Sequence, residues 1–432
     1  MSRFAHSFRL RGDLWSNGDF LRLWAAQSIS QVGSQVSQLA LPLVAILALD
    51  ATAFEVALLA ALEFLPFLLF ALPAGVWVDR LPRRPILILA DVGRALALAS
   101  IPVAAVFDAI TLWQLYAVGF AVGSLTVAFD VAYQPYLPAL IRRSQLVEGN
   151  SKLELSRSVA QIGGPGLGGL LVAALTAPYA VAVDAVSFIV SAIFLRRIRT
   201  PEPPLERPEQ TSWRVELIEG LRYLFGDPRW RAFTAYVATI NFFSSGLVFS
   251  ILLVFAVREL GLSAAQIGLI LAVSNTGSLA AALGAGRISR RLGVGPTLIL
   301  AGILSGVPLL FLPLATPEHA VSLLLAPLLL EAFAIVLFNI TGISYIQAVV
   351  PDRILGRMTA SRRFVVWGTI PLGAVAGGAL ASTIGLRETI LVGAVGSTFC
   401  FLFLLVSPFR SIRQPPAPEV DDVLTRSCGE VP

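Results

Sequence analysis

Twelve long apolar runs dominate this sequence of 432 residues and constrain what it can fold into. They lie at about 20–48, 54–78, 85–107, 111–133, 155–176, 179–196, 231–256, 264–286, 296–315, 320–347, 363–384 and 388–408. A helix crosses a bilayer with roughly 20 apolar residues, so each run provides one span. Because 56% of the residues are hydrophobic and only 14% are charged, a disordered chain, a coiled coil and an ordinary soluble enzyme are excluded. We predict an all-α membrane protein with twelve transmembrane helices.

The runs form two groups of six on either side of a polar segment that contains several prolines. We predict an N-terminal six-helix bundle at 1–198, a cytoplasmic linker at 199–230, a C-terminal six-helix bundle at 231–410 and a cytoplasmic tail at 411–432. Within the linker, apolar residues recur at helical spacing between Trp213 and Leu224. They indicate an amphipathic helix, which lies either on the membrane surface or on the cytoplasmic ends of the bundle.

The two groups of six resemble each other at an offset of 209 residues. Tyr136 then aligns with Tyr345, and the pair Gly168-Gly169 aligns with Gly377-Gly378. Parallel duplicated halves are one way in which transporters are built, with the substrate site at their interface near the middle of the membrane. The two halves are therefore predicted to be pseudo-symmetric.

Basic residues are sorted to one side of the predicted spans. With the N-terminus placed inside, the N-terminal segment, the even-numbered loops and the tail, counted with the span ends next to them, hold 29 of the 32 Lys and Arg residues. Lys and Arg concentrate in cytoplasmic loops, so both termini are predicted to be cytoplasmic. The same sorting accounts for the net charge of +5 without a nucleic-acid partner. Two cysteines and two histidines, widely spaced, predict neither a disulfide framework nor a metal site.

A charged motif follows the second apolar run, in a short predicted cytoplasmic loop. Its sequence from Gly75 to Arg84 is Gly-Val-Trp-Val-Asp-Arg-Leu-Pro-Arg-Arg. The motif resembles the loop signature of the major facilitator superfamily, with proline in place of the family's second glycine. The resemblance implies the major facilitator fold, in which this loop latches the two halves together in the outward-open state.

The residues that the resemblance assigns to this latch are Gly75, Asp79, Arg80, Arg83 and Arg84, with Asp130 as their acid partner. The alternative is that the arginines only set the topology of the chain.

A glycine-rich motif lies in the fifth run. Its signature residues are Gly164, Pro165, Gly168 and Gly169. They resemble the Gly-Pro-x-x-Gly-Gly signature of antiporters in the same superfamily, which is a hallmark of exporters. The alternative is simple helix packing, because small residues let membrane helices approach closely.

The fourth run lacks the arginine that many drug–proton antiporters carry there, although Gly119 and Gly123 are present. The whole pattern, over roughly residues 15–410, looks most like the bacterial branch of macrolide-efflux and siderophore-exporter proteins.

A few ionisable residues interrupt the apolar runs. Because a charge in hydrocarbon is costly, each is a functional candidate. Glu63, Glu331 and Asp184 are predicted as proton-coupling residues, since a carboxyl group buried without a cation can take up and release a proton. The alternative for each is a neutral acid hydrogen-bonded to a neighbouring helix. Asp91 and Arg94 are three residues apart and are predicted to form a local ion pair.

Polar residues also share one face of the first run. Gln27, Gln31, Ser34 and Gln38 are spaced by 4, 3 and 4 residues, as on one side of a helix. We predict that this face lines the substrate path, together with Asn241 and Asn339; the alternative is hydrogen bonding between helices.

These features predict a secondary active exporter in a bacterial inner membrane. It would carry a small amphiphilic molecule, a drug or a siderophore-like compound, by alternating access with proton antiport. The proton gradient would replace any cofactor, since no nucleotide-binding signature occurs in the sequence. The expected partners are the substrate, protons and the lipid bilayer, with the protein acting as a monomer. An importer or lysophospholipid flippase on the same fold, and a membrane receptor or scaffold that does not transport, are the alternatives; an enzyme is not expected.

Overall fold

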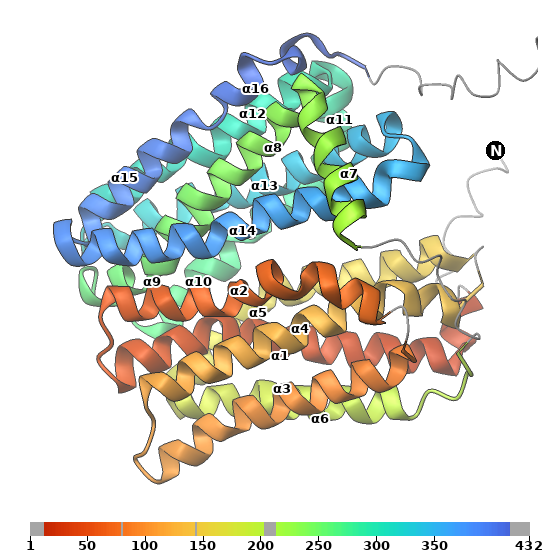
Figure 1. Cartoon of the computed structure of the whole chain (residues 1–432). Coiled ribbons are helices and arrows are strands. Elements are labelled where there is room, and N and C mark those ends of the chain that lie inside the picture. The colour runs from red at the N-terminus through yellow and green to blue at the C-terminus, as the bar shows by residue number, and fades with distance from the viewer. Residues whose placement is uncertain (1–12, 79–80, 143–144, 203–212, 415–432) are drawn as a thin grey trace, which may run out of the picture.

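The structure, a computed structural model, describes residues 13–78, 81–142, 145–202 and 213–414. Within these residues every regular element is a helix, and twelve helical segments are long and apolar enough to cross a membrane, as predicted. The first six are α1 (Gly18–Ala48), α2 (Ala53–Val78), α3 (Arg83–Val106), α4 (Leu112–Leu140), α5 (Leu146–Leu175) and α6 (Ala177–Arg196). Figure 1 shows them in red to yellow-green.

The second six spans follow the linker helix α7 (Trp213–Gly226). Spans seven to nine are α8 (Pro228–Ile240) with η3 (Asn241–Val248) and α9 (Phe249–Arg258), α10 (Ala264–Ser274) with α11 (Thr276–Leu292), and α12 (Val294–Gly306) with η4 (Val307–Leu314). Spans ten to twelve are α13 (Ala320–Val349), α14 (Asp352–Ile384) and α15 (Leu386–Phe399) with α16 (Leu402–Leu405). Short 3₁₀ turns lie outside the spans at η1 (Asp13–Ser16) and η5 (Pro408–Ser411).

Several helices extend past the apolar runs. Helix α4 continues to Leu140, α5 begins at Leu146 and α14 begins at Asp352, so each adds polar turns to its predicted span. A backbone can keep its helical hydrogen bonds beyond the apolar part of a span, because those bonds do not depend on side-chain polarity.

Two spans of the second half change their helical geometry along their length. Span seven contains the π-helical stretch η3, and span nine turns into the 3₁₀ helix η4. In η4, Pro308 and Pro313 lack the backbone donors that an α-helix needs, which favours the change.

Each group of six helices packs mainly on itself. In the first, α1 contacts α5 and α6, and α3 contacts α4 and α6; in the second, α13 contacts α11 and α12, and α14 contacts η3. The two groups meet where α2 packs on α14 and α5 packs on α10. Figure 1 shows the two groups one above the other.

The two ends of the bundle differ in how the halves share a core. At the end remote from the arginine clusters, one continuous buried cluster joins Val44 and Leu59 of the first half to Phe255 and Leu309 of the second. At the arginine-rich end each half has its own cluster, one around Tyr136 and the other around its pseudo-equivalent Tyr345. The halves therefore share one core at one end and have separate cores at the other.

Helix α7 lies on the second half, on the side of α14 (Figure 1). Its Gly220 faces the backbone of Arg357, and Ser361 Oγ donates a hydrogen bond to the Leu217 carbonyl at 3.2 Å. Glu219 and Arg357 form an ion pair of 2.5 Å. Of the two predicted placements, the structure has the helix packed on the bundle.

Candidate functional site: a cavity between the halves

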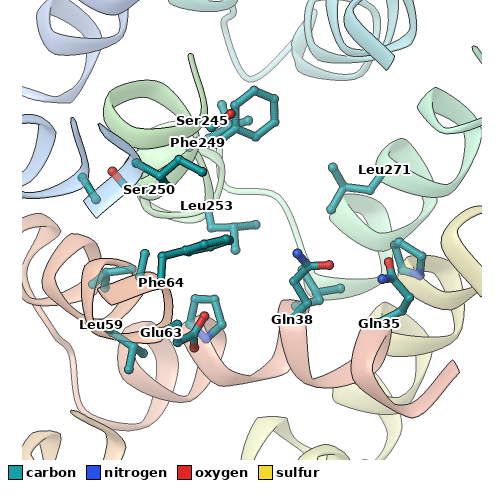
Figure 2. Close-up of a pocket in the computed structure, with 18 of the residues that line it drawn as sticks. Gln35, Gln38, Leu59, Glu63, Phe64, Ser245, Phe249, Ser250, Leu253 and Leu271 are labelled. Atoms are coloured by element: carbon teal, nitrogen blue, oxygen red, sulfur yellow. The ribbon is translucent and has the colours of Figure 1, made fainter. Parts of the chain in front are cut away.

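A cavity of about 460 Å³ lies between the two groups of helices. This volume is within the usual range for small-molecule sites. Its polar lining residues are Gln35, Gln38, Glu63, Ser245, Ser250, Asn275 and Glu331, and its apolar ones include Phe64, Phe249, Leu253 and Leu271. Figure 2 shows side chains of both halves directed toward the same space. The site is thus shared, as expected for duplicated halves.

Helix α1 contributes Gln35 and Gln38 to the cavity (Figure 2). Of the predicted polar face, only Gln38 is among the lining residues. Gln27, Gln31 and Ser34 lie closer to the arginine-rich end of α1. Gln27 is buried, and its Nε2 has no hydrogen-bond partner among the described residues.

Gln35 was missed because it lies outside the spacing of that polar face. Sequence alone does not fix how far α1 is rotated about its axis. Its neighbours decide this: Gly33 faces Asp184 and Ser187 on α6, whereas Gly164 of α5 lies against the Gln35 side chain.

Glu63 on α2 lies at the cavity wall, half-buried (Figure 2). Its carboxyl group has no hydrogen bond or ion pair with another described residue. Two glycines of α4 create the space for it: a methyl group at Gly119 would lie 3.1 Å from Glu63 Cγ, and one at Gly123 would overlap the Glu63 carbonyl. The glycine pair of the fourth span therefore positions this acid.

Glu331 on α13 reaches the same cavity from the second half. It is buried, and its Oε1 accepts a hydrogen bond of 3.0 Å from Ser244 Oγ. Ser244 lies in the π-helical stretch η3, and π-bulges occur frequently at functional sites. The cavity thus combines two membrane-embedded carboxyl groups, one from each half.

Asp184 lies elsewhere, inside the first half. It is buried on α6, where Ser187 Oγ donates to it at 3.0 Å. On α3, Asp91 and Arg94 form the predicted ion pair, and Ser191 Oγ donates to Asp91 at 2.6 Å. The structure therefore separates Asp184 from the two acids at the cavity, and its coupling role stays a prediction.

The glycine motif of α5 packs on both halves at once. Gly164 and Gly168 face α1, with a methyl group at Gly168 3.3 Å from Val36 Cα. Gly169 faces α10, where a methyl group would lie 2.9 Å from Gly268 Cα. Pro165 lines the cavity. The motif thus lies at the interface of the halves, beside the site.

The two predicted asparagines differ from a third that the sequence analysis missed. Asn241 Nδ2 donates to the Val366 carbonyl at 2.8 Å, tying η3 to α14, and Asn339 is exposed. Neither is among the cavity residues. Asn275 does line the cavity, and its Nδ2 donates to the Gln161 carbonyl of the other half at 2.6 Å. The sequence signal for Asn275 is an amide side chain inside an apolar run; the structure places it at the break between α10 and α11.

The latch motif is described only in part. Gly75 lies in the last turns of α2, whereas Asp79 and Arg80 lie outside the described residues. The backbone N–H groups of Arg83 and Arg84 donate to the Glu202 carboxylate at 2.8 and 2.7 Å.

The side chains of these two arginines stay within the first half. Arg84 Nε donates to the Leu195 carbonyl at 3.1 Å, and Arg83 contacts the Pro135 carbonyl at 3.4 Å. Neither of these two arginines pairs with Asp130, and because Arg80 lies outside the described residues the contact between the motif and Asp130 stays a prediction. The cations that act on Asp130 are Arg94 and, from the other half, Arg363. The latch role of this motif therefore stays a prediction.

Twelve spans in two groups, with a site between them, define a membrane transporter of the major facilitator type. The chain belongs to the transmembrane secretion effector family, whose model matches residues 15–427. This membership identifies it as a transporter rather than an enzyme.

Two curated relatives are bacterial efflux proteins. The multidrug efflux pump Tap of Mycolicibacterium fortuitum is 28% identical over 392 residues, covering 87% of this chain and 92% of the pump. Macrolide efflux protein A of Streptococcus pyogenes is 26% identical over 184 residues, covering 42% of this chain and 45% of that protein.

Solved transporters share the fold at low identity. The nucleoside transporter NupG superposes with a TM-score of 0.72 at 13% identity, over 90% of this chain and 98% of NupG. A bacterial homologue of the iron transporter ferroportin gives 0.70 in its inward-facing state and 0.59 in its outward-facing state, at 17% identity. These matches cover 90% and 91% of this chain and 98% and 99% of the homologue.

Proposed function

We propose that the protein is a bacterial inner-membrane exporter of a small neutral or cationic amphiphile, drug-like or siderophore-like, driven by proton antiport. The observation that carries this proposal is the cavity between the halves, which Glu63 lines from the first half and Glu331 from the second, in an otherwise largely apolar site. The relatives named as efflux pumps support export.

The two carboxyl groups supply the coupling. Ionising a carboxyl group in apolar surroundings is costly, so it is neutralised either by a proton or by a cationic substrate. Glu63 has no partner among the described residues to share that charge. If proton and substrate compete for this site, release of one permits binding of the other, which is the requirement of an antiporter.

Alternating access follows from the two ends of the bundle. With the arginine-rich end in the cytoplasm, as the sorting of basic residues favours, the separate cores of the two halves there support an inward-facing state. The better superposition on the inward-facing ferroportin homologue supports this assignment. Rocking of the halves about the α2–α14 and α5–α10 contacts would then expose the cavity to the other side. One chain encloses the cavity, which supports function as a monomer.

Direction of transport tests the proposal. Inside-out vesicles that contain the protein are acidified inside and given a radiolabelled macrolide or a lipophilic cation. We expect accumulation that a protonophore abolishes. Proton-driven uptake by right-side-out vesicles instead would favour an importer, and absence of flux for every compound would favour a receptor or scaffold.

The fold does not choose among substrates, because one fold hosts many functions. A lysophospholipid flippase on this fold would move a labelled lysophospholipid between leaflets in the same vesicles. We expect no such movement above that of protein-free vesicles.

A further inference from the structure

A cluster of arginines lies at the arginine-rich end of the first half, away from the cavity. Arg22 of α1, Arg84 of α3 and Arg196 of α6 converge there with Arg197 and Arg199, which follow α6. Together they line a pocket of about 560 Å³. Topology alone requires basic residues at this end of the spans, but it does not require three segments to direct theirs into one pocket.

Most of this positive charge is uncompensated. Arg22 pairs with Asp19, and the Arg84 guanidinium donates to the carbonyls of Leu195 and Arg196. The side chains of Arg196, Arg197 and Arg199 are exposed and form no hydrogen bond or ion pair with another described residue. Three neighbouring guanidinium groups that have no ion-pair partner among the described residues repel one another, so the pocket favours an anion.

Two described acids lie beside the pocket, Asp19 and Glu202, and both accept hydrogen bonds from backbone N–H groups. Both oxygens of Glu202 accept hydrogen bonds from the backbone N–H groups at the start of α3. This carboxylate caps a helix N-terminus and adds to its stability there. Together with Asp19 it offsets part of the positive charge, and five arginines against these two acids leave the described surface positively charged.

An apolar groove continues from the cluster. A neighbouring pocket of about 800 Å³ shares Arg84, Arg196 and Arg199 with it and extends over Ile88 and Leu89 of α3. Leu89 is 69% exposed, as is Leu96 seven residues further along the same helix face. Exposed leucines on a membrane span face lipid, so the positive pocket opens directly onto the hydrocarbon side of α3.

We propose that this surface binds an anionic phospholipid of the cytoplasmic leaflet. The headgroup phosphate lies on Arg196, Arg197 and Arg199, and one acyl chain follows α3 past Leu89. Guanidinium groups bind phosphate oxygens through charge-assisted, often bidentate hydrogen bonds. Basic pockets between transmembrane helices on the cytoplasmic side bind such headgroups. The lipid would hold together the ends of α1, α3 and α6 and the start of the linker.

The first experiment separates lipid from free phosphate. The purified full chain in a neutral detergent is titrated with dioleoyl-phosphatidylglycerol, dioleoyl-phosphatidylcholine or inorganic phosphate, while thermal unfolding and native mass spectra are recorded. We expect the anionic lipid alone to stay bound and to raise the unfolding midpoint. An equal rise with phosphatidylcholine, or with inorganic phosphate, would overturn the lipid assignment.

The second experiment tests the location. The triple variant R196Q/R197Q/R199Q should bind the anionic lipid about tenfold or more weakly, because it loses charge-assisted hydrogen bonds to the phosphate. Its matched control is R287Q/R290Q/R291Q on α11, which removes three exposed charges from the same end of the second half. Equal loss in the control would show attraction to surface charge in general and overturn the site.

A further variant keeps every arginine. Leu89→Gln leaves the headgroup pocket intact but disturbs the acyl groove at an exposed position. We expect weaker binding of the dioleoyl lipid and unchanged binding of a short-chain phosphatidylglycerol. If Leu89→Gln leaves dioleoyl binding unchanged, the acyl chain does not follow α3 and the proposed site is wrong.

Discussion

The two contacts between the halves, α5 on α10 and α2 on α14, are built alike but differ in chemistry. At the offset of 209 residues Gly169 aligns with Gly378, and each faces the opposite half. A methyl group at Gly169 would lie 2.9 Å from Gly268 Cα on α10, and one at Gly378 would lie 2.9 Å from Phe54 Cα on α2. Close backbone approach is therefore a property of both interfaces.

The acids do not follow this symmetry. Glu63 on α2 aligns with Ala272 on α10, and Glu331 on α13 aligns with Val122 on α4. Each carboxyl group thus has an apolar residue at its pseudo-equivalent position. The comparison teaches that duplication supplied the packing of the two interfaces, whereas the ionisable groups of the cavity occur once each.

The strongest test of the shared packing is Gly169→Ala. The added methyl group meets backbone atoms of α10, which cannot rotate away, so overpacking should cost about 1–3 kcal/mol. We expect transport in vesicles to fall about tenfold or more, because that cost disfavours the state in which α5 and α10 are packed.

Two glycine variants sharpen this result. Gly163→Ala on the same helix meets nothing within 4 Å and should transport like the wild type. Gly378→Ala should resemble Gly169→Ala if both interfaces are closed by backbone approach. Full activity of Gly169→Ala would disprove the tight packing.

The next test addresses Glu63 and Glu331, the two acids that have apolar residues at their pseudo-equivalent positions. Glu63→Gln cannot ionise, so proton-driven accumulation should fall about tenfold or more, while exchange of labelled substrate without a gradient continues. Glu331→Gln keeps an oxygen that accepts from Ser244 and should fall only about threefold, since one hydrogen bond is preserved.

Exposed Glu318 provides the matched control for charge removal outside the cavity, and Glu318→Gln should have no effect. If Glu331→Gln loses coupling and Glu63→Gln retains it, the two roles are reversed. A pH profile of efflux that neither variant changes would remove both acids from coupling.

The smallest expected effect distinguishes two faces of α1. Gln35→Leu removes a polar group from the cavity wall, and we expect the ratio of cationic to neutral substrate exported to change about threefold. Gln31→Leu, outside the lining, should leave that ratio unchanged. The opposite result, measured in the same competition assay with protein levels matched, would favour the face predicted from the sequence.

Local features of the sequence were enough to predict much of the fold. The apolar runs gave the twelve spans because span length depends on bilayer thickness and side-chain polarity, both local properties. The pair Asp91–Arg94 was predictable because helix geometry brings residues three apart together. The small size of the α5 glycines predicted close helix approach, which the structure shows against α1 and α10.

Features that depend on neighbouring helices were missed or misplaced. Gln35 replaces Gln31 at the cavity because Gly33 of α1 packs on α6 and Gly164 of α5 packs on Gln35, and these contacts set the rotation of α1. Asp184 lies within the first half because Ser187 and the α1–α6 contact hold it there. The acid that meets the latch motif is Glu202 of the linker, which no spacing rule connects to Arg83 and Arg84.

The sequence by itself determined that this chain is a membrane protein with twelve spans and two related halves. Hydrophobicity, charge sorting and repeated glycines are local properties of the sequence, so they can be interpreted without knowledge of the fold. Only the tertiary structure decided which two carboxyl groups share a cavity and which arginines converge on one pocket. Those groupings depend on helix rotation and on contacts between residues far apart in the chain, and packing fixes both.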